Sequence, residues 1–99
     1  MISIKIHKSY RTVVAICDSA LVGKKFEEGK RQLDVTESFY KGEKVSEESA
    51  VKIIQMQARE DATFNIVGEK SIKAAISAGI INKEGISKLG GIPFALVLV

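Results

Sequence analysis

The chain has 99 residues, of which 45% are hydrophobic and 27% are charged, and its formal net charge is +3. This length and composition are typical of one compact domain, predicted over residues 1–99, and they exclude a disordered chain or a second domain. The longest uncharged apolar run, residues 89–99, is shorter than the roughly 20 residues that a membrane-spanning helix needs. Because the N-terminus also lacks the pattern of a secretory signal, we expect a cytoplasmic protein with no membrane contact.

The N-terminal third is predicted to be mostly strand. Residues 2–7 alternate between isoleucine and polar side chains, the pattern of a strand with one solvent-exposed face. Residues 11–17 are apolar on both faces, which indicates a more central strand that forms a hairpin with the first. A short third strand is predicted over residues 31–35. One helical turn, capped by Thr36, is expected to follow and to end at Gly42.

The remaining residues predict alternating helices and strands. Ser46 is a good N-cap for an amphipathic helix, and Glu47 and Glu48 suit the positive end of its dipole. Gly79 and Gly90 are typical residues after a helix end. The predicted elements are a helix over 47–59, a strand over 63–67, a helix over 69–78, a short helix over 82–89 and a final strand over 94–98.

This order of elements predicts the fold class. Strands come first, and strand and helix then alternate. The order favours an α+β fold, a two-layer sandwich in which a mixed sheet of about five strands carries two main helices on one face. The final strand is apolar on both sides, so it is expected in the interior of the sheet.

Few residues are available for catalytic or metal chemistry. The chain has one histidine, His7, and one cysteine, Cys17. A structural zinc site needs about four such ligands, so we expect no metal and no cofactor. Cys17 lies in an apolar run and is interpreted as a buried structural thiol. His7 lies on the polar face of the first strand, and no nucleophile that it could activate is evident. We identify no catalytic residue.

A basic stretch between the second and third predicted strands is the best functional lead from composition. Lys24, Lys25, Lys30 and Arg31 surround Phe26, whose ring is available for stacking. Such a patch is suited to RNA phosphates. Two glutamates interrupt it, however, and a solvated surface is the ordinary interpretation of a mixed run. Residues 1–44 contain nine Lys and Arg against six Asp and Glu, whereas residues 45–99 contain six of each.

Two glycine loops are the other candidates. In "NIVGEKS" a strand passes through Gly68 into a helix whose start has the geometry to hold an anion. Neither a dinucleotide-binding nor a P-loop motif is present, so a tight strand-to-helix turn is the favoured interpretation. In "LGGIP", Gly90 and Gly91 allow the backbone of a tight turn. Pro93 begins the final strand, at a position where the backbone N–H that proline lacks is not needed as a donor.

Four segments together resemble the small archaeal family catalogued as domain of unknown function 424. They are "VVAICDSALVGKKFEEG", "LDVTESFYKGE", "ATFNIVGEKSI" and "ISKLGGIPFA", and they cover nearly the whole chain. The resemblance implies an archaeal cytosolic protein with a compact α+β fold, associated with translation. It brings no established activity. Such family patterns often continue with histidine after the proline, where this chain has Phe94, and the resemblance leaves open whether Phe94 replaces a functional histidine.

Three hypotheses follow. The first is a non-catalytic protein that binds ribosomal RNA, tRNA or a ribosomal protein through its basic patch, with the glycine loops around Gly68 and Gly90-Gly91 as a shaped rim. The second is a small-ligand binder or enzyme with a site where the two glycine loops meet. The third is a protein-interaction module that pairs through an exposed strand edge. The loop residues of the second hypothesis are Asn65, Gly68, Glu69, Lys70, Gly90, Gly91 and Pro93.

Overall fold

The main structural element is a six-stranded mixed sheet. The computed structural model describes residues 1–98, so Val99 of the predicted closing apolar stretch lies outside the described residues. Within residues 1–98, β2 and β6 are the one parallel pair of neighbours in this sheet, and the other neighbours are antiparallel. The predicted α+β fold with a mixed sheet is confirmed, with six strands in place of about five. Their order is β5 (Glu43–Val45), β1 (Ile2–His7), β2 (Val13–Asp18), β6 (Thr63–Val67), β8 (Ile92–Val97) and β7 (Ser87–Leu89).

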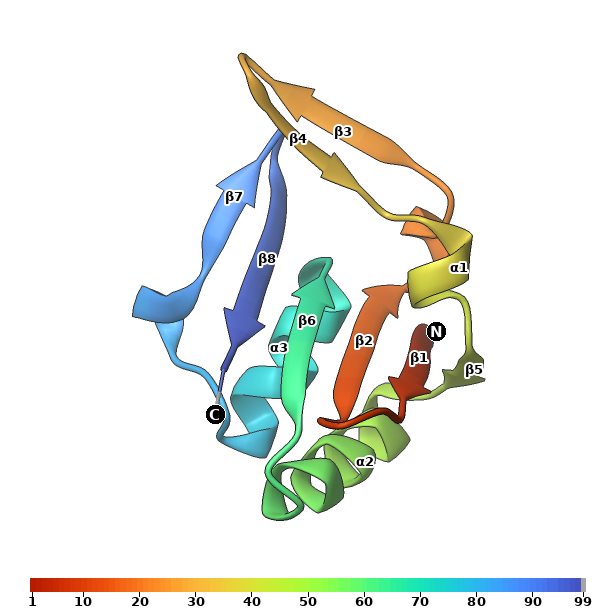
Figure 1. Cartoon of the computed structure of the whole chain (residues 1–99). Helices are drawn as coiled ribbons and strands as arrows, with labels where there is room; N and C mark the ends of the chain where they lie inside the picture. The colour runs from red at the N-terminus through yellow and green to blue at the C-terminus, as the bar shows by residue number, and fades with distance from the viewer. Residues whose placement is uncertain (99) are drawn as a thin grey trace.

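Two helices cover one face of this sheet (Figure 1). The bounds of α2 (Glu47–Arg59) and α3 (Glu69–Ala78) are those that the sequence predicts. Ser46 caps α2, because its hydroxyl accepts a hydrogen bond from the Ser49 N–H at 3.1 Å. The sheet turns alternate residues toward the helices, and these form the larger hydrophobic core. Its fully buried members include Ile2, Val14, Ile16, Ile54, Phe64 and Ile66.

The opposite face is covered in part by the segment between β2 and β5. It contains the single-turn η1 (Ser19–Leu21), β3 (Lys25–Glu28), β4 (Arg31–Asp34) and α1 (Glu37–Tyr40). Phe26, Leu33 and Val35 from this segment pack against Cys17 and Val67 of the sheet in a second core. The third predicted strand is therefore present, but its place is different. It pairs with β3 alone, across a two-residue Gly29-Lys30 connection, and not with the main sheet.

The C-terminal region differs from the prediction. Residues 82–89 do not form a helix ended by Gly90; a short turn, η2 (Lys83–Gly85), leads into strand β7. Gly90 and Gly91 both have positive φ, 57° and 80°, which is the backbone that a tight hairpin turn requires. The turn folds β8 back beside β7. As predicted, β8 lies inside the sheet, between β6 and β7, although Leu96 on its uncovered face is 57% exposed.

Candidate functional site

The four predicted basic residues lie on the β3–β4 hairpin, which we call the hairpin arm (residues 24–35). Lys24 and Lys25 are at its base and Lys30 and Arg31 are at its tip, and all four side chains are exposed. The arm lies outside the main sheet and extends beyond its upper end (Figure 1). The structure therefore places all four cations on the hairpin arm, two at its base and two at its tip.

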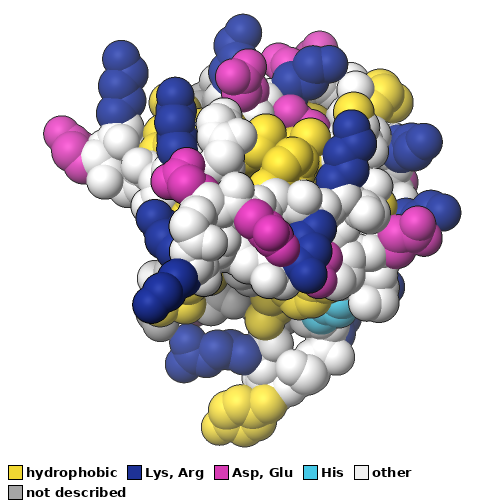
Figure 2. All heavy atoms as spheres, turned by 90° about the horizontal axis from the view of Figure 1, so that it is seen from above, with side chains coloured by type: hydrophobic (Ala, Val, Ile, Leu, Met, Phe, Trp, Pro, Cys, Tyr) yellow, Lys and Arg dark blue, Asp and Glu magenta, His cyan; other side chains and the backbone are white. Residues whose placement is uncertain are grey.

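The surroundings of these cations are of mixed charge. Lys25 Nζ lies 4.0 Å from Glu27 Oε1, and Arg31 faces Glu28 in the strand register. Figure 2 shows this end of the molecule, where Lys and Arg side chains are interspersed with Asp and Glu. The expected role of Phe26 is corrected, because its ring turns inward and packs in the second core. The inward packing leaves Phe26 poorly placed to stack on a base.

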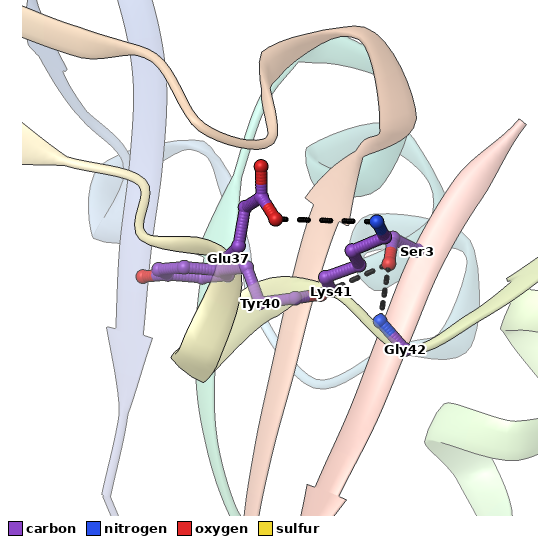
Figure 3. Close-up of polar contacts among 5 residues, drawn as sticks. All are labelled: Ser3, Glu37, Tyr40, Lys41 and Gly42. Carbon is purple, nitrogen blue, oxygen red and sulfur yellow. Dashed lines mark hydrogen bonds and ion pairs between the residues drawn. The ribbon is translucent and has the colours of Figure 1, made fainter.

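The hydroxyl group of Ser3 in β1 forms hydrogen bonds to the segment that follows the hairpin arm (Figure 3). Ser3 Oγ donates to the Tyr40 carbonyl at 2.9 Å and accepts from the Gly42 N–H at 2.9 Å. The exposed pair Glu37–Lys41, at 3.9 Å, adds little because solvent screens it. His7 is bound to the same segment: its Nε2 lies 2.8 Å from the Phe39 carbonyl oxygen, and its ring stacks on Phe39. The histidine thus has a structural role.

The two predicted glycine loops meet. The Gly68 N–H donates to the Pro93 carbonyl at 2.9 Å, beside the carboxyl ends of the parallel strands β2 and β6. A pocket of about 220 Å³ lies there, which we call the loop pocket. Ligands of α/β sheets commonly bind at such strand ends. The loop pocket is lined by Asp18, Leu21, Gly68, Glu69, Lys70, Gly91, Ile92 and Pro93.

Two predicted loop residues lie elsewhere. Asn65 lies in the middle of β6, between Ala15 and Leu96, and is not part of the pocket lining. The Gly90 N–H donates to Glu28 Oε1 at 3.0 Å and so ties the hairpin arm to the β7–β8 turn. Sequence reasoning missed Asp18, Leu21 and Ile92. For Asp18 the sequence offers one signal of a site, a carboxylate directly after an apolar strand. It offers none for Leu21 or Ile92.

Asp18 occupies the start of α3. Its Oδ1 accepts from the Ser71 N–H and hydroxyl, both at 2.8 Å, and its Oδ2 accepts from the Lys70 N–H at 3.1 Å. A carboxylate of the chain itself therefore satisfies these free donors and complements the helix dipole. This arrangement leaves the Gly68 loop as a tight strand-to-helix turn and disfavours a phosphate at the same position.

Cys17 and Tyr40 lie below the hairpin arm in the second core. Burial, and to a smaller extent the charge of Asp18, raises the pKa of the Cys17 thiol to about 12. Burial and the neighbouring Cys17 raise the pKa of Tyr40 to about 12. A thiol in this state is a poor nucleophile, because the thiolate is the reactive form.

Residues 1–98 contain no cluster of three or more His, Cys, Asp or Glu placed to hold a metal ion. The helices described within residues 1–98 also lack the combined length and hydrophobicity that a membrane span requires.

Comparison with known proteins supports the resemblance seen in the sequence. A family model described as protein of unknown function (DUF424) matches residues 6–99. The chain belongs to this family. A solved structure, described as that of an uncharacterized conserved protein from Methanopyrus kandleri, is similar to this DUF424 chain with a TM-score of 0.89 and 27% identity. The match covers 97% of this chain and 89% of the other. No curated protein matches.

Proposed function

We propose that this DUF424 protein is a non-catalytic, cytoplasmic RNA-associated protein whose hairpin arm contacts RNA phosphates. The observation that carries the proposal is the state of the arm's cations. Among the described residues, the side chains of Lys24, Lys30 and Arg31 are exposed and have no hydrogen-bond or ion-pair partner. They can therefore bind phosphates without first breaking an interaction within the protein. An archaeal origin, as for the structural neighbour, is part of the same proposal.

The salt dependence of binding gives a quantitative expectation. Each phosphate neutralised on a single strand releases counterions, with a slope of about −0.7 in log affinity against log salt. Four contacts therefore predict a slope of about −3, which is a loss of roughly 50-fold between 50 and 200 mM salt. Lysine acts as a point charge, so little base specificity is expected from the arm.

The test compares two variants of equal charge change. In the arm variant, Lys24, Lys25, Lys30 and Arg31 are all replaced by Gln. The control variant replaces four exposed lysines on other surfaces, Lys44, Lys52, Lys73 and Lys83, by Gln. Binding of tRNA and ribosomal RNA fragments is measured by fluorescence anisotropy across a salt series. We expect the arm variant to lose the salt slope and most of its affinity, while the control stays near wild type. Equal losses in both variants, or none in the arm variant, would sink the proposal.

The loop pocket favours a second candidate function, binding of a small ligand. Its walls combine the apolar side chains of Leu21, Ile92 and Pro93 with the charged groups of Glu69 and Lys70. A volume of about 220 Å³ is below the roughly 300 Å³ at which ligand pockets usually begin, so the ligand would be a fragment-sized molecule.

Amide chemical shifts of the protein, measured against a library of small fragments, test this candidate. We expect the amides of Gly68, Lys70 and Gly91 to move together on binding, and Leu21→Trp to abolish the effect by filling the pocket. Ile76→Trp, on the exposed side of α3, is the control. Fragments that move only amides outside the pocket would count against a ligand site there.

A further inference from the structure

The loop between β1 and β2 presents an aromatic ring to solvent. Tyr10 is fully exposed, at 103% of its reference surface, whereas Tyr40, the other tyrosine, is buried at 7%. The loop itself is ordered by local contacts. Ser9 Oγ donates to the Arg11 carbonyl at 3.1 Å, and the Thr63 N–H donates to the Thr12 carbonyl at 3.0 Å, which joins the loop to the start of β6. Hydrogen bonds therefore hold the backbone on both sides of Tyr10 in place.

A hollow of about 500 Å³ lies beside this ring. It is lined by Tyr10, Arg11 and Thr12 from the loop and by Glu60 and Asp61 from the turn after α2. Its volume is within the range of sites for small molecules and single nucleotides. The carboxylates of Glu60 and Asp61 share the lining with the cationic Arg11, so the hollow is of mixed charge. The hollow therefore combines a stacking surface, hydrogen-bond acceptors and a cation within its own lining.

We infer that Tyr10 and this hollow bind one unpaired RNA base. The inference rests on the proposed function for the class of ligand, but not on the hairpin arm, which lies at the opposite end of the sheet (Figure 1). Aromatic side chains stack on bases that are splayed out of single strands. The carboxylates of Glu60 and Asp61 accept hydrogen bonds from an exocyclic amino group, such as cytosine N4. Uracil lacks this group, so cytosine is preferred over uracil.

Tyrosine fluorescence reports directly on the site, because the chain has no tryptophan and two tyrosines. In the Tyr40→Phe variant, Tyr10 is the one remaining emitter. Titration with single-stranded oligocytidine is expected to quench its emission, with weaker quenching by oligouridine and none by an RNA duplex. Tyr10→Ala is expected to weaken oligocytidine binding by about 5- to 150-fold, as for one stacked base, and Tyr10→Phe to retain it. Ile76→Ala, also at a surface hydrophobic residue, is the control and is expected to have no effect.

The carboxylates have a separate test. Glu60→Gln combined with Asp61→Asn keeps the size of both side chains and removes their charge. This variant is expected to bind oligocytidine and oligouridine equally. Equal binding of the two by the wild-type protein would overturn the assigned role of the carboxylates.

The outcomes distinguish this inference from the proposed function. If the arm variant loses RNA affinity while RNA leaves Tyr10 emission unchanged, base stacking is refuted and the role of the hairpin arm stands. If oligocytidine quenches Tyr10 emission while the arm variant and its control variant bind tRNA equally well, the stacking site stands and the role of the arm is refuted. Unchanged affinity of Tyr10→Ala for oligocytidine would also refute stacking.

Discussion

The carboxylate of Asp18 occupies the space into which any side chain at Gly68 would project. A Cβ atom at position 68 would lie 2.6 Å from Asp18 Oδ1 and 2.7 Å from Oδ2, closer than such atoms can approach. The same carboxylate accepts the backbone hydrogen bonds of Lys70 and Ser71. The two residues together fix the turn from β6 into α3, which forms one wall of the loop pocket.

Substitution of Gly68 by alanine is expected to destabilise the fold strongly. Its φ of 107° is a conformation that residues with a side chain rarely adopt, and the added Cβ would displace the Asp18 cap. Together these effects are expected to lower the free energy of unfolding by about 2–4 kcal/mol. Urea denaturation measures the loss. Gly85→Ala is the control, since no heavy atom lies within 4 Å of a Cβ built there. Equal losses in the two variants would contradict this account.

The energetic coupling between Asp18 and Gly68 is a separate prediction. Asp18→Ala removes the cap of α3 and is expected to cost about 1–2 kcal/mol. It also removes the carboxyl atoms with which a Cβ at position 68 would collide. Gly68→Ala should therefore cost less in the Asp18→Ala background than in the wild type. A double-mutant cycle of unfolding free energies measures this difference. Strictly additive effects would show that the contact has no energetic role.

Ser3→Ala is expected to loosen the segment that carries α1. The substitution leaves the Tyr40 carbonyl and the Gly42 N–H without the hydroxyl group that bonds them both (Figure 3). Polar groups left unsatisfied in a buried position cost about 1–3 kcal/mol. Thermal or urea unfolding measures this loss, with Ser77→Ala on the exposed side of α3 as the control. A loss no larger than that of the control would mean that water replaces the hydroxyl without cost.

Stability is expected to fall at alkaline pH. Between about pH 9 and 12 the thiol of Cys17 ionises in the unfolded chain but stays protonated in the folded one, since its pKa rises from 9.0 to about 12. Tyr40 behaves in the same way between 10.0 and about 12. The unfolded state then binds fewer protons, so the free energy of unfolding decreases as pH rises, by at most about 1.4 kcal/mol per pH unit for each group.

Unfolding free energies measured from pH 8 to 11 test this expectation. Cys17→Ala should reduce the slope above pH 9, and Tyr40→Phe should reduce it above pH 10. The slope is the readout, because either substitution also changes packing and therefore the stability at pH 8. A slope that neither substitution changes would assign the alkaline effect to other groups.

Local sequence patterns were enough to predict the two main helices, the strand between them and the N-terminal hairpin. Their signals are local: Ser46 caps α2, Gly79 follows α3 in a left-handed conformation, and residues 2–7 alternate with the period of a strand. Local hydrogen bonds and hydrophobic periodicity depend on few distant contacts, so these elements could be predicted.

Other features of the fold depend on contacts between distant parts of the chain. The sequence of residues 82–89 predicts a helix, but pairing with β8 across the Gly90-Gly91 turn makes residues 87–89 a strand. Strand formation depends on the strand beside it, which a local pattern does not specify. Phe26 turns inward because a distant apolar face is there to bury it. The hydrogen bonds of Asp18 span more than fifty positions, and Tyr10 and Asp61 meet at one hollow from distant turns. Such juxtapositions arise from the packing of the whole chain, and no local pattern encodes them.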